Sequence, residues 1–144
     1  MENNKTEVNI LTLCDYAQEY SGRLMITGAF NSLVLPKFPF TYPEIALVAR
    51  FSVPSPGEHI IEFGIKEVSG KHTLMEKQSI KMTSTGNLRT PYANLIIKGN
   101  NVVIPEPGDY QVLFKIDGQE FITQLIVSDE RNSRLVKSEL QIKK

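Results

Sequence analysis

One internal repeat constrains the fold of this chain more than any other feature. Residues 53–65 read VPSPGEHIIEFGI, and residues 104–116 read IPEPGDYQVLFKI. Each copy has two prolines, a glycine, an acidic residue and a ring, followed by alternating apolar residues. Proline stops a strand because it cannot donate to the ladder, and glycine permits a sharp turn. The repeat therefore predicts two equivalent corners, where strands leave one β-sheet and enter another.

Four residues of the repeat receive structural roles at these corners. Gly57 and Gly108 are expected at turns where a Cβ atom would be awkward. His59 and Tyr110 follow two residues later, so that their rings can pack back over the corner. Tyr110 is the better match to the tyrosine corner of sandwich domains, because a histidine replaces it in the first copy. Two copies are too few for a solenoid.

Alternating apolar residues predict short strands along most of the chain. Asp117-Gly118 is the strongest hairpin signal, whereas residues 15–22 and 99–101 are expected to be turns, the first with room for one helical turn. The three prolines of residues 32–43 indicate an extended connection or an edge. The strands are predicted at 7–14, 23–31, 44–53, 58–68, 72–83, 92–98, 110–116 and 119–127. We expect an all-β fold, a two-sheet antiparallel-rich β-sandwich (Ig-like or C2-like) with about eight short strands and minimal helix; a closed β-barrel is the alternative.

The length of 144 residues suits one domain. We assign residues 1–127 to the sandwich and residues 128–144 to a C-terminal extension. The extension is expected to begin as a polar loop and to end in an edge strand at about 135–142, because its apolar residues recur with a period of two. A strand on such a loop can pair with its own sheet or with a neighbouring copy, so the tail offers one route to a homodimer.

The charge balance and the N-terminus exclude several classes of protein. The chain has 16 basic and 16 acidic residues, which argues against a nucleic-acid partner. No run approaches the roughly 20 apolar residues that span a bilayer, and the N-terminal apolar stretch breaks at Asp15 without a basic region before it. We therefore expect no membrane association and a cytoplasmic protein in which the single cysteine, Cys14, is reduced.

The reactive side chains do not form a catalytic pattern. Cys14 lies inside an apolar strand and is interpreted as a small buried residue. His59 and His72 have no partner at metal-ligand spacing. Asp15 and Glu19 are interpreted as part of a capped turn rather than an acid–base pair. We expect no catalytic residue, no metal and no cofactor.

The segment 36–43, PKFPFTYP, carries the one candidate binding site. Phe38, Phe40 and Tyr42 are spaced by two, so in an extended chain their rings point the same way. Two interpretations follow: the rings form a contact surface for a partner, or they fold over the open end of the sandwich as a lid on the core. The lid is the favoured interpretation.

Five short motifs resemble a known pattern. They are LCDYA at 13–17, G-x-L-x-I-x-G-x-F at 22–30, PGEH at 56–59, PGDY at 107–110 and Asp117-Gly118. Over about residues 6–127 the chain resembles a small bacterial family of uncharacterised β-sandwich domains. The resemblance implies a compact, intracellular β-sandwich and brings no activity with it.

Together these features favour a non-enzymatic binding or adaptor domain that acts through a sheet face, a sheet edge or the segment 36–43. The expected partner is another protein or a second copy of the chain. The alternative is a structural subunit that works by self-association.

Overall fold

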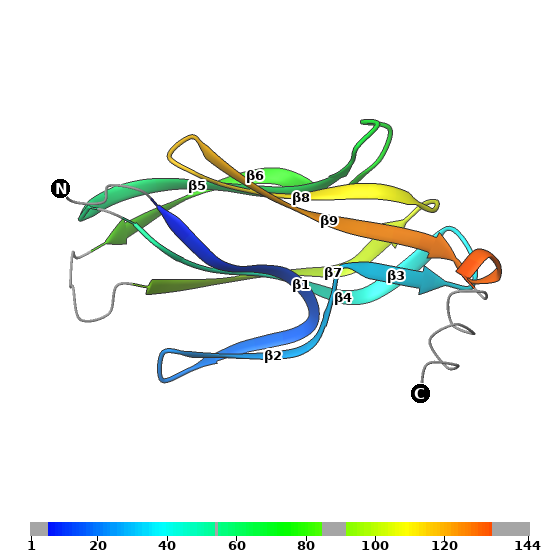
Figure 1. Ribbon diagram of the computed structural model, residues 1–144, viewed down its shortest axis with the longest axis horizontal. Helices are drawn as coiled ribbons and strands as arrows, with labels where there is room; N and C mark the ends of the chain where they lie inside the picture. The colour runs from blue at the N-terminus through cyan, green and yellow to red at the C-terminus, as the bar shows by residue number, and fades with distance from the viewer. Residues whose placement is uncertain (1–5, 54, 85–91, 134–144) are drawn as a thin grey trace, which may run out of the picture.

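Two β-sheets lie face to face in this chain (Figure 1). The structure, a computed structural model, describes residues 6–53, 55–84 and 92–133. Their nine strands are β1 (Glu7–Tyr20), β2 (Arg23–Phe30), β3 (Ser32–Leu35), β4 (Phe40–Ser52), β5 (Gly57–Glu67), β6 (Thr73–Ser84), β7 (Tyr92–Ile104), β8 (Gly108–Ile116) and β9 (Gln119–Asp129). The four-stranded sheet has the order β2-β1-β4-β7, and the five-stranded sheet has the order β3-β9-β8-β5-β6. Both sheets are open, so the predicted β-sandwich is confirmed and the closed barrel is wrong.

The core lies between the two sheets. Every second residue of β5 and β8 faces inward, which is the pattern that predicted these strands. Phe63 lies directly across from Phe114 in the five-stranded sheet. The ring of Phe114 also contacts that of Phe51 in the other sheet, with centroids 5.3 Å apart. These buried aromatic rings join the two layers, because each removes a large apolar surface from water.

Both copies of the internal repeat lie where the chain changes sheets. The first connects β4 to β5 and the second connects β7 to β8, each time from the four-stranded to the five-stranded sheet. Gly57 has a φ of 105°, a conformation that side chains rarely adopt. At Gly108 the constraint is contact instead, because an added Cβ atom would lie 2.7 Å from Oε2 of Glu67.

The two corners close with different rings at the same position. The Tyr110 hydroxyl donates to the Glu106 carbonyl oxygen, four residues earlier, at 2.9 Å. In the first corner, Nε2 of buried His59 lies 2.8 Å from the Ser55 carbonyl oxygen, again four residues earlier. Nδ1 of the same ring lies 2.6 Å from Oδ2 of Asp117. Both neighbours of the imidazole are acceptors, so the ring satisfies both only as a cation.

The His59–Asp117 pair ties the first corner to the β8–β9 turn. The hydrogen bond to Asp117 raises the pKa of His59, and the same bond lowers the pKa of Asp117. The second oxygen of this carboxylate accepts from the Ile60 backbone N–H at 2.9 Å. At the first corner an imidazolium donates to the backbone carbonyl oxygen four residues earlier, and at the second corner a neutral phenol does so.

Two of the predicted turns are wrong. Residues 15–20 continue β1, and the hairpin turn falls at Ser21-Gly22, where φ is 51° and 78°. Residues 99–101 lie inside β7, whose ladder with β4 continues through Glu44↔Asn100 and Tyr42↔Val102. Asn101 has a φ of 53°, but the register of the ladder is the same on both sides of it.

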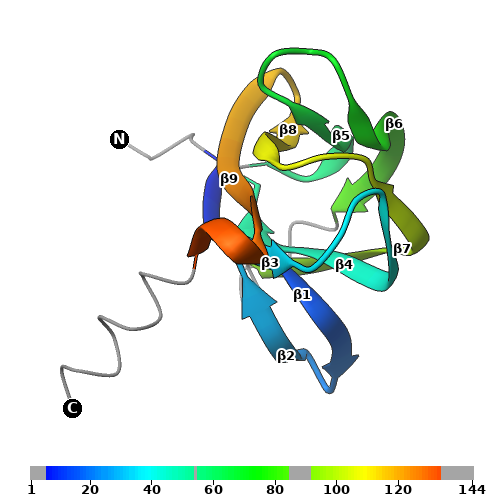
Figure 2. The ribbon, with the colours of Figure 1, turned by 90° about the vertical axis from the view of Figure 1, so that its right-hand side faces the viewer.

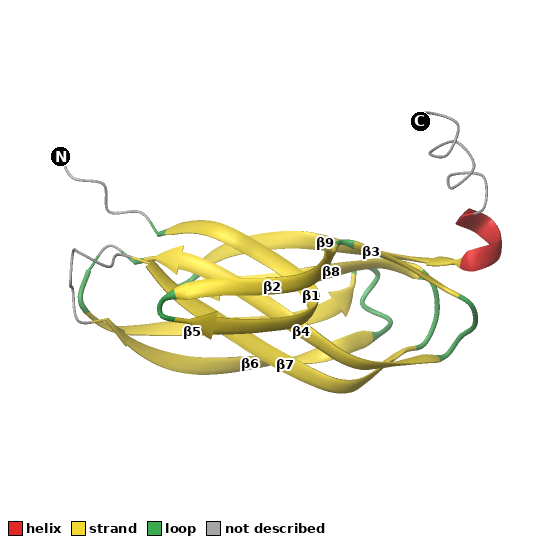
Figure 3. Ribbon diagram, turned by 90° about the horizontal axis from the view of Figure 1, so that it is seen from below, coloured by secondary structure: helices red, strands yellow, loops and turns green. Residues whose placement is uncertain are grey.

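The start of the proline-containing segment and the end of the last strand differ from the expectations. Residues 32–35 form a short strand, β3, which pairs with β9 in parallel, whereas all other pairings are antiparallel. β9 extends to Asp129, and a short 3-10 helix, η1 (Glu130–Ser133), follows it (Figure 3). The strand predicted at 135–142 lies outside the described residues.

Candidate interaction surface

The β1–β2 hairpin leaves the sandwich and folds back beneath it. The first part of β1 pairs with β4 as far as Cys14↔Ala46, and the second part pairs with β2 from Leu13↔Phe30 onward. Leu13 and Cys14 pair with both strands. Just after them β1 bends sharply, and the hairpin returns under the four-stranded sheet (Figures 1 and 2). We call residues 15–30 the arm. It forms a third layer on the outer face of this sheet.

A small second core holds the arm in place. Its members are apolar residues of the hairpin and of the outward side of the sheet, and it is separate from the main core. Cys14, Ala17, Ala46 and Val48 are at most 2% exposed. Ile10, Leu24, Ile26 and Ile96 pack around them. The arm is thus attached by the same apolar burial that holds the two sheets together.

A polar contact fixes the tip of the arm. Nδ2 of Asn94, on β7, lies 3.1 Å from Oε2 of Glu19 and 3.4 Å from the carbonyl oxygen of Gly22. β7 lies at the far side of the four-stranded sheet from β2 in strand order. The arm therefore reaches across the outer face of this sheet.

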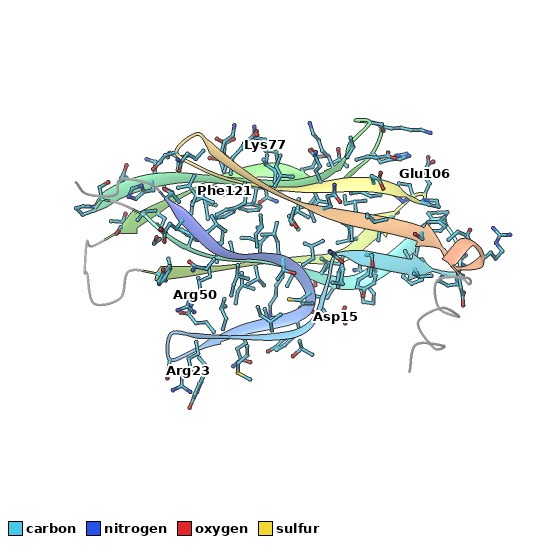
Figure 4. The ribbon with its side chains drawn as sticks, viewed as in Figure 1. Asp15, Arg23, Arg50, Lys77, Glu106 and Phe121 are labelled. Atoms are coloured by element: carbon cyan, nitrogen blue, oxygen red, sulfur yellow. The ribbon has the colours of Figure 1, made fainter. Side chains whose placement is uncertain are left out.

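Asp15, Gly28 and Tyr42 form the hinge at the base of the arm, where Figure 4 shows Asp15 at the bend of β1. The Tyr42 hydroxyl donates to Oδ1 of Asp15 at 2.7 Å. Gly28 has a φ of 68°, and a Cβ atom added to it would lie 2.5 Å from Oδ2 of Asp15. Burial, and then the hydrogen bond to Asp15, raise the pKa of Tyr42 from 10.0 to about 12. The missing side chain of Gly28 thus leaves room for the carboxylate that receives the phenol.

The predicted aromatic site lies beside this hinge. Phe38, Phe40 and Tyr42 are half-buried and pack against the main core. Phe40 and Tyr42 belong to β4, and their ring centroids are 6.2 Å apart. Phe30, from the base of the arm, contacts Tyr42 at 5.9 Å. Each of the three rings therefore has one part against the core and another part exposed, and the lid and the contact surface remain the two interpretations to be tested.

The outer side of the arm carries the two most exposed aromatic side chains, Tyr20 and Tyr16, together with the exposed Met25. Tyr20 is 62% exposed, Met25 is 53% exposed and Tyr16 is 44% exposed. The register places Tyr20 across from Arg23 and Gln18 across from Met25, so these side chains share one face. Tyrosine, methionine and arginine are enriched in protein–protein interfaces. Sequence reasoning missed this surface because it assigned Tyr16 and Tyr20 to a turn, so the strand predicted at 23–31 had no hairpin partner in residues 15–20.

β2 also offers a free edge. Four strands end the two sheets: β2, β7, β3 and β6. β6 has charged residues along its length and a register shift, β3 has only four residues, and β7 contains Lys98 and contacts β6. β2 has eight residues, no proline and one charge, Arg23, at its first position. β7 likewise has one charged residue and no proline, and Gly28, with a φ of 68°, interrupts β2, so only the first part of β2, Arg23 to Thr27, is a regular open edge.

The outer face of the five-stranded sheet has a different character. A hollow of about 380 Å³ lies over Gly64, where β6 passes close to the glycine backbone. Its polar rim contains Lys66, Lys77, Lys115, Glu76 and Glu120. Lys77 is paired with Glu62 at 3.0 Å. The charges of this face are mixed and nearly cancel, so the hollow selects no class of ligand by charge.

The remaining reactive groups have structural partners. Asp15 and Glu19 do not contact each other; one binds Tyr42 and the other binds Asn94. Burial raises the pKa of the Cys14 thiol, which makes it a poor nucleophile. His72 Nε2 lies 2.6 Å from Oε2 of Glu106 on the surface. Within residues 6–53, 55–84 and 92–133 no three histidine, cysteine or acidic side chains gather as metal ligands would.

The fold and this surface define the chain as a two-sheet β-sandwich domain with a folded-back hairpin arm. It belongs to a family of unknown function, DUF6941, which matches residues 9–127. No curated protein matches the sequence. No helix in the described part of the chain is long and apolar enough to span a bilayer.

Parts of two solved structures are similar to most of this chain at low identity. The alkylpurine DNA glycosylase AlkC of Pseudomonas fluorescens, bound to DNA containing an abasic site analog, matches 85% of this chain at 10% identity with a TM-score of 0.50. A beta-glucosidase from Listeria innocua in complex with glucose matches 86% at 11% identity with a TM-score of 0.49. The matches cover 30% and 16% of those chains. The likeness to AlkC concerns the fold alone.

Proposed function

We propose that this chain is a non-enzymatic protein-binding domain whose contact surface is the outer side and free edge of the arm. The observation that carries the proposal is the set of side chains exposed there. Tyr16, Tyr20, Met25 and Arg23 are of the types enriched at interface cores, where large rigid side chains exclude water at low entropic cost. The opposite face of the molecule exposes lysine and glutamate, which interfaces tend to exclude.

Three features of the chain support binding rather than catalysis. The candidate nucleophile Cys14 is buried, the acidic side chains Asp15 and Glu19 serve the hinge and the tip of the arm, and the two histidines have structural partners. The single buried thiol also suits a reducing compartment, so we place this activity in the bacterial cytoplasm.

Site-specific photo-crosslinking in the source cells tests the proposal. A benzophenone amino acid replaces Tyr20 in the full chain, and a matched control replaces Lys77 on the five-stranded sheet. We expect a discrete protein adduct from position 20 and none from position 77, with the protein in each adduct identified by mass spectrometry. Adducts from position 77 alone, or from neither position, would refute the arm as the contact surface.

A further inference from the structure

We infer that the corner between β4 and β5 is a pH-sensitive switch, in which the protonated ring of His59 holds Ser55 and the neutral ring releases it. His59 is 4% exposed, and its ring nitrogens lie 2.6 Å from Oδ2 of Asp117 and 2.8 Å from the carbonyl oxygen of Ser55. An ionised carboxylate and a carbonyl only accept, so both bonds form only while each ring nitrogen has a hydrogen. The switch lies outside the arm and does not depend on the function proposed for it.

Loss of one proton breaks the bond to Ser55 rather than the bond to Asp117. A neutral imidazole has one N–H, and a hydrogen bond to an ionised carboxylate is stronger than one to a neutral carbonyl. The remaining hydrogen therefore stays on Nδ1, and the proton that leaves Nε2 goes to water. The lone pair of Nε2 then faces the Ser55 carbonyl oxygen, and two acceptors at 2.8 Å repel each other.

The backbone is fixed on the Asp117 side of the ring and weakly held on the Ser55 side. Oδ1 of Asp117 accepts from the Ile60 N–H at 2.9 Å, and the Asp117 N–H donates to the Ile60 carbonyl oxygen at 2.9 Å. Residues 55–57 are exposed, and among the described residues Ser55 has no hydrogen bond other than that to His59. Deprotonation therefore frees residues 55–57 and leaves the β8–β9 turn in place.

Asp117 is the only charged group that acts on the ring among the described residues of either sheet. On β6 the residue across from His59 is the uncharged Met82, and Glu58 and Lys81 lie 3.9 Å apart on the outward side of the ladder. The hydrogen bond to Asp117 raises the pKa of His59 from 6.5. Because folding favours the charged form, the corner is closed below pH 6.5 and opens as the pH rises through the raised pKa.

The second corner is an internal control for the first. The Tyr110 hydroxyl donates to the Glu106 carbonyl oxygen at 2.9 Å, and a phenol makes this bond in its neutral form. Burial raises the pKa of Tyr110 from 10.0 to about 12, so its bond persists at the pH at which His59 loses its proton. The two copies of the repeat therefore respond differently to pH within one molecule.

A nuclear magnetic resonance titration of the full chain from about pH 5.5 to about pH 9 tests the inference. The nitrogen-15 shifts of the ring show which nitrogen has a hydrogen, and the heteronuclear NOE of the backbone amides reports mobility at each residue. We expect His59 to lose its hydrogen from Nε2 with a midpoint above pH 6.5. The mobility of Ser55 and Gly57 should rise with the same midpoint, whereas that of Gly108 and Tyr110 should not change.

Two variants link the movement of the corner to the ring. Asp117→Asn removes the anion but keeps an acceptor oxygen, so the midpoints of the ring and of the corner should fall together by about one to three pH units. His72→Gln removes the other histidine of the chain, which binds the Glu106 carboxylate, and should leave both midpoints unchanged. Circular dichroism checks that both variants are folded.

Three results would overturn this inference, and the wild type alone can give each of them. A ring that is neutral throughout the titration has no proton to lose. A ring that loses its hydrogen from Nδ1 releases Asp117 instead of Ser55. Mobility of Ser55 and Gly57 that does not follow the titration of His59 shows that the ring does not control the corner.

Discussion

The outer faces of the two sheets differ in their residue types and in their exposure to water. The four-stranded sheet has apolar side chains on its outer face, among them Ala46 and Val48, and the arm covers them completely. The five-stranded sheet has lysines, glutamates and glutamine around a hollow on its outer face. A sheet with two apolar faces must be covered on both, whereas a sheet with a charged outer face needs one partner layer only. The sequence of each outer face thus decides whether a third layer forms.

The arm that covers the four-stranded sheet also exposes a new surface. A hairpin has two faces and two edges, so placing one face on the sheet leaves the other exposed. In the arm that exposed face contains Tyr16, Tyr20 and Met25, and the outer edge belongs to β2. The third layer therefore protects one apolar surface and creates another, which is the surface we assign to binding.

The largest effect is expected from placing a charge under the arm. Val48→Asp buries a carboxylate without a partner, so the free energy of unfolding should fall by roughly 3–5 kcal/mol. Ile122→Asp, on the exposed face of the five-stranded sheet, should change it by no more than about 0.5 kcal/mol. Urea denaturation measures both. Equal losses would show that the two outer faces do not differ in burial.

Alanine substitutions at Phe40 and Tyr20 distinguish a ring that covers the core from a ring on the proposed contact surface. Phe40→Ala removes a ring packed against the core and should lower stability by about 1–3 kcal/mol, or several degrees in melting temperature. Tyr20→Ala should leave the melting curve of the monomer within about one degree, because the ring lies mostly in water. A reversed order of the two melting temperatures would make segment 36–43 the exposed site.

Gly28 tests the hinge. Gly28→Ala both strains a left-handed backbone and pushes against the Asp15 carboxylate, so we expect a loss of about 1–2 kcal/mol. Gly118→Ala is the control, since its φ is also positive, at 88°, but no atom lies within 4 Å of the added carbon. The hinge variant should lose more than the control in thermal unfolding. A smaller loss at Gly28 would mean that the carboxylate moves away at no cost.

The hydrogen bond of Tyr42 gives the smallest effect and a pH signature. Tyr42→Phe should cost about 1 kcal/mol at neutral pH. Its pKa rises from 10.0 to about 12 on folding, so its contribution to stability is complete below pH 10 and is lost as the pH rises through 12. The pKa of Tyr110 is also raised from 10.0 to about 12, so its contribution to stability is lost over the same pH range. Stability measured from pH 9 to 12 should therefore fall less steeply in Tyr42→Phe and in Tyr110→Phe than in the wild type; an unchanged slope in Tyr42→Phe would contradict the bond.

The sandwich was predictable because its signals are local. The Pro-x-Pro-Gly repeats and Asp117-Gly118 fix turns through residues next to one another, and alternation identifies the strands between them. The arm was not predictable in this way. Gln18, Glu19 and Tyr20 are polar or exposed, and the partner of Glu19 is Asn94, far along the chain. Its second core likewise combines residues from β1, β2, β4 and β7.

The Ser21-Gly22 turn was the one local signal for the arm. Its two positive φ values match those of Asp117-Gly118, yet Ser-Gly is a weaker hairpin signal than Asp-Gly. The continuation of β7 through Gly99, Asn100 and Asn101 was hidden for a related reason. Residues typical of turns remain in a strand there because the ladder with β4 continues on both sides of Asn101.

Hydrogen–deuterium exchange of the full chain tests the central claim most directly. The amides that join β1 to β2 beyond Asp15 should be protected, like those that join β8 to β9, because the second core holds the arm against the four-stranded sheet. Exchange of the β1–β2 amides at the rate of a free peptide would contradict the account of the arm as a packed third layer.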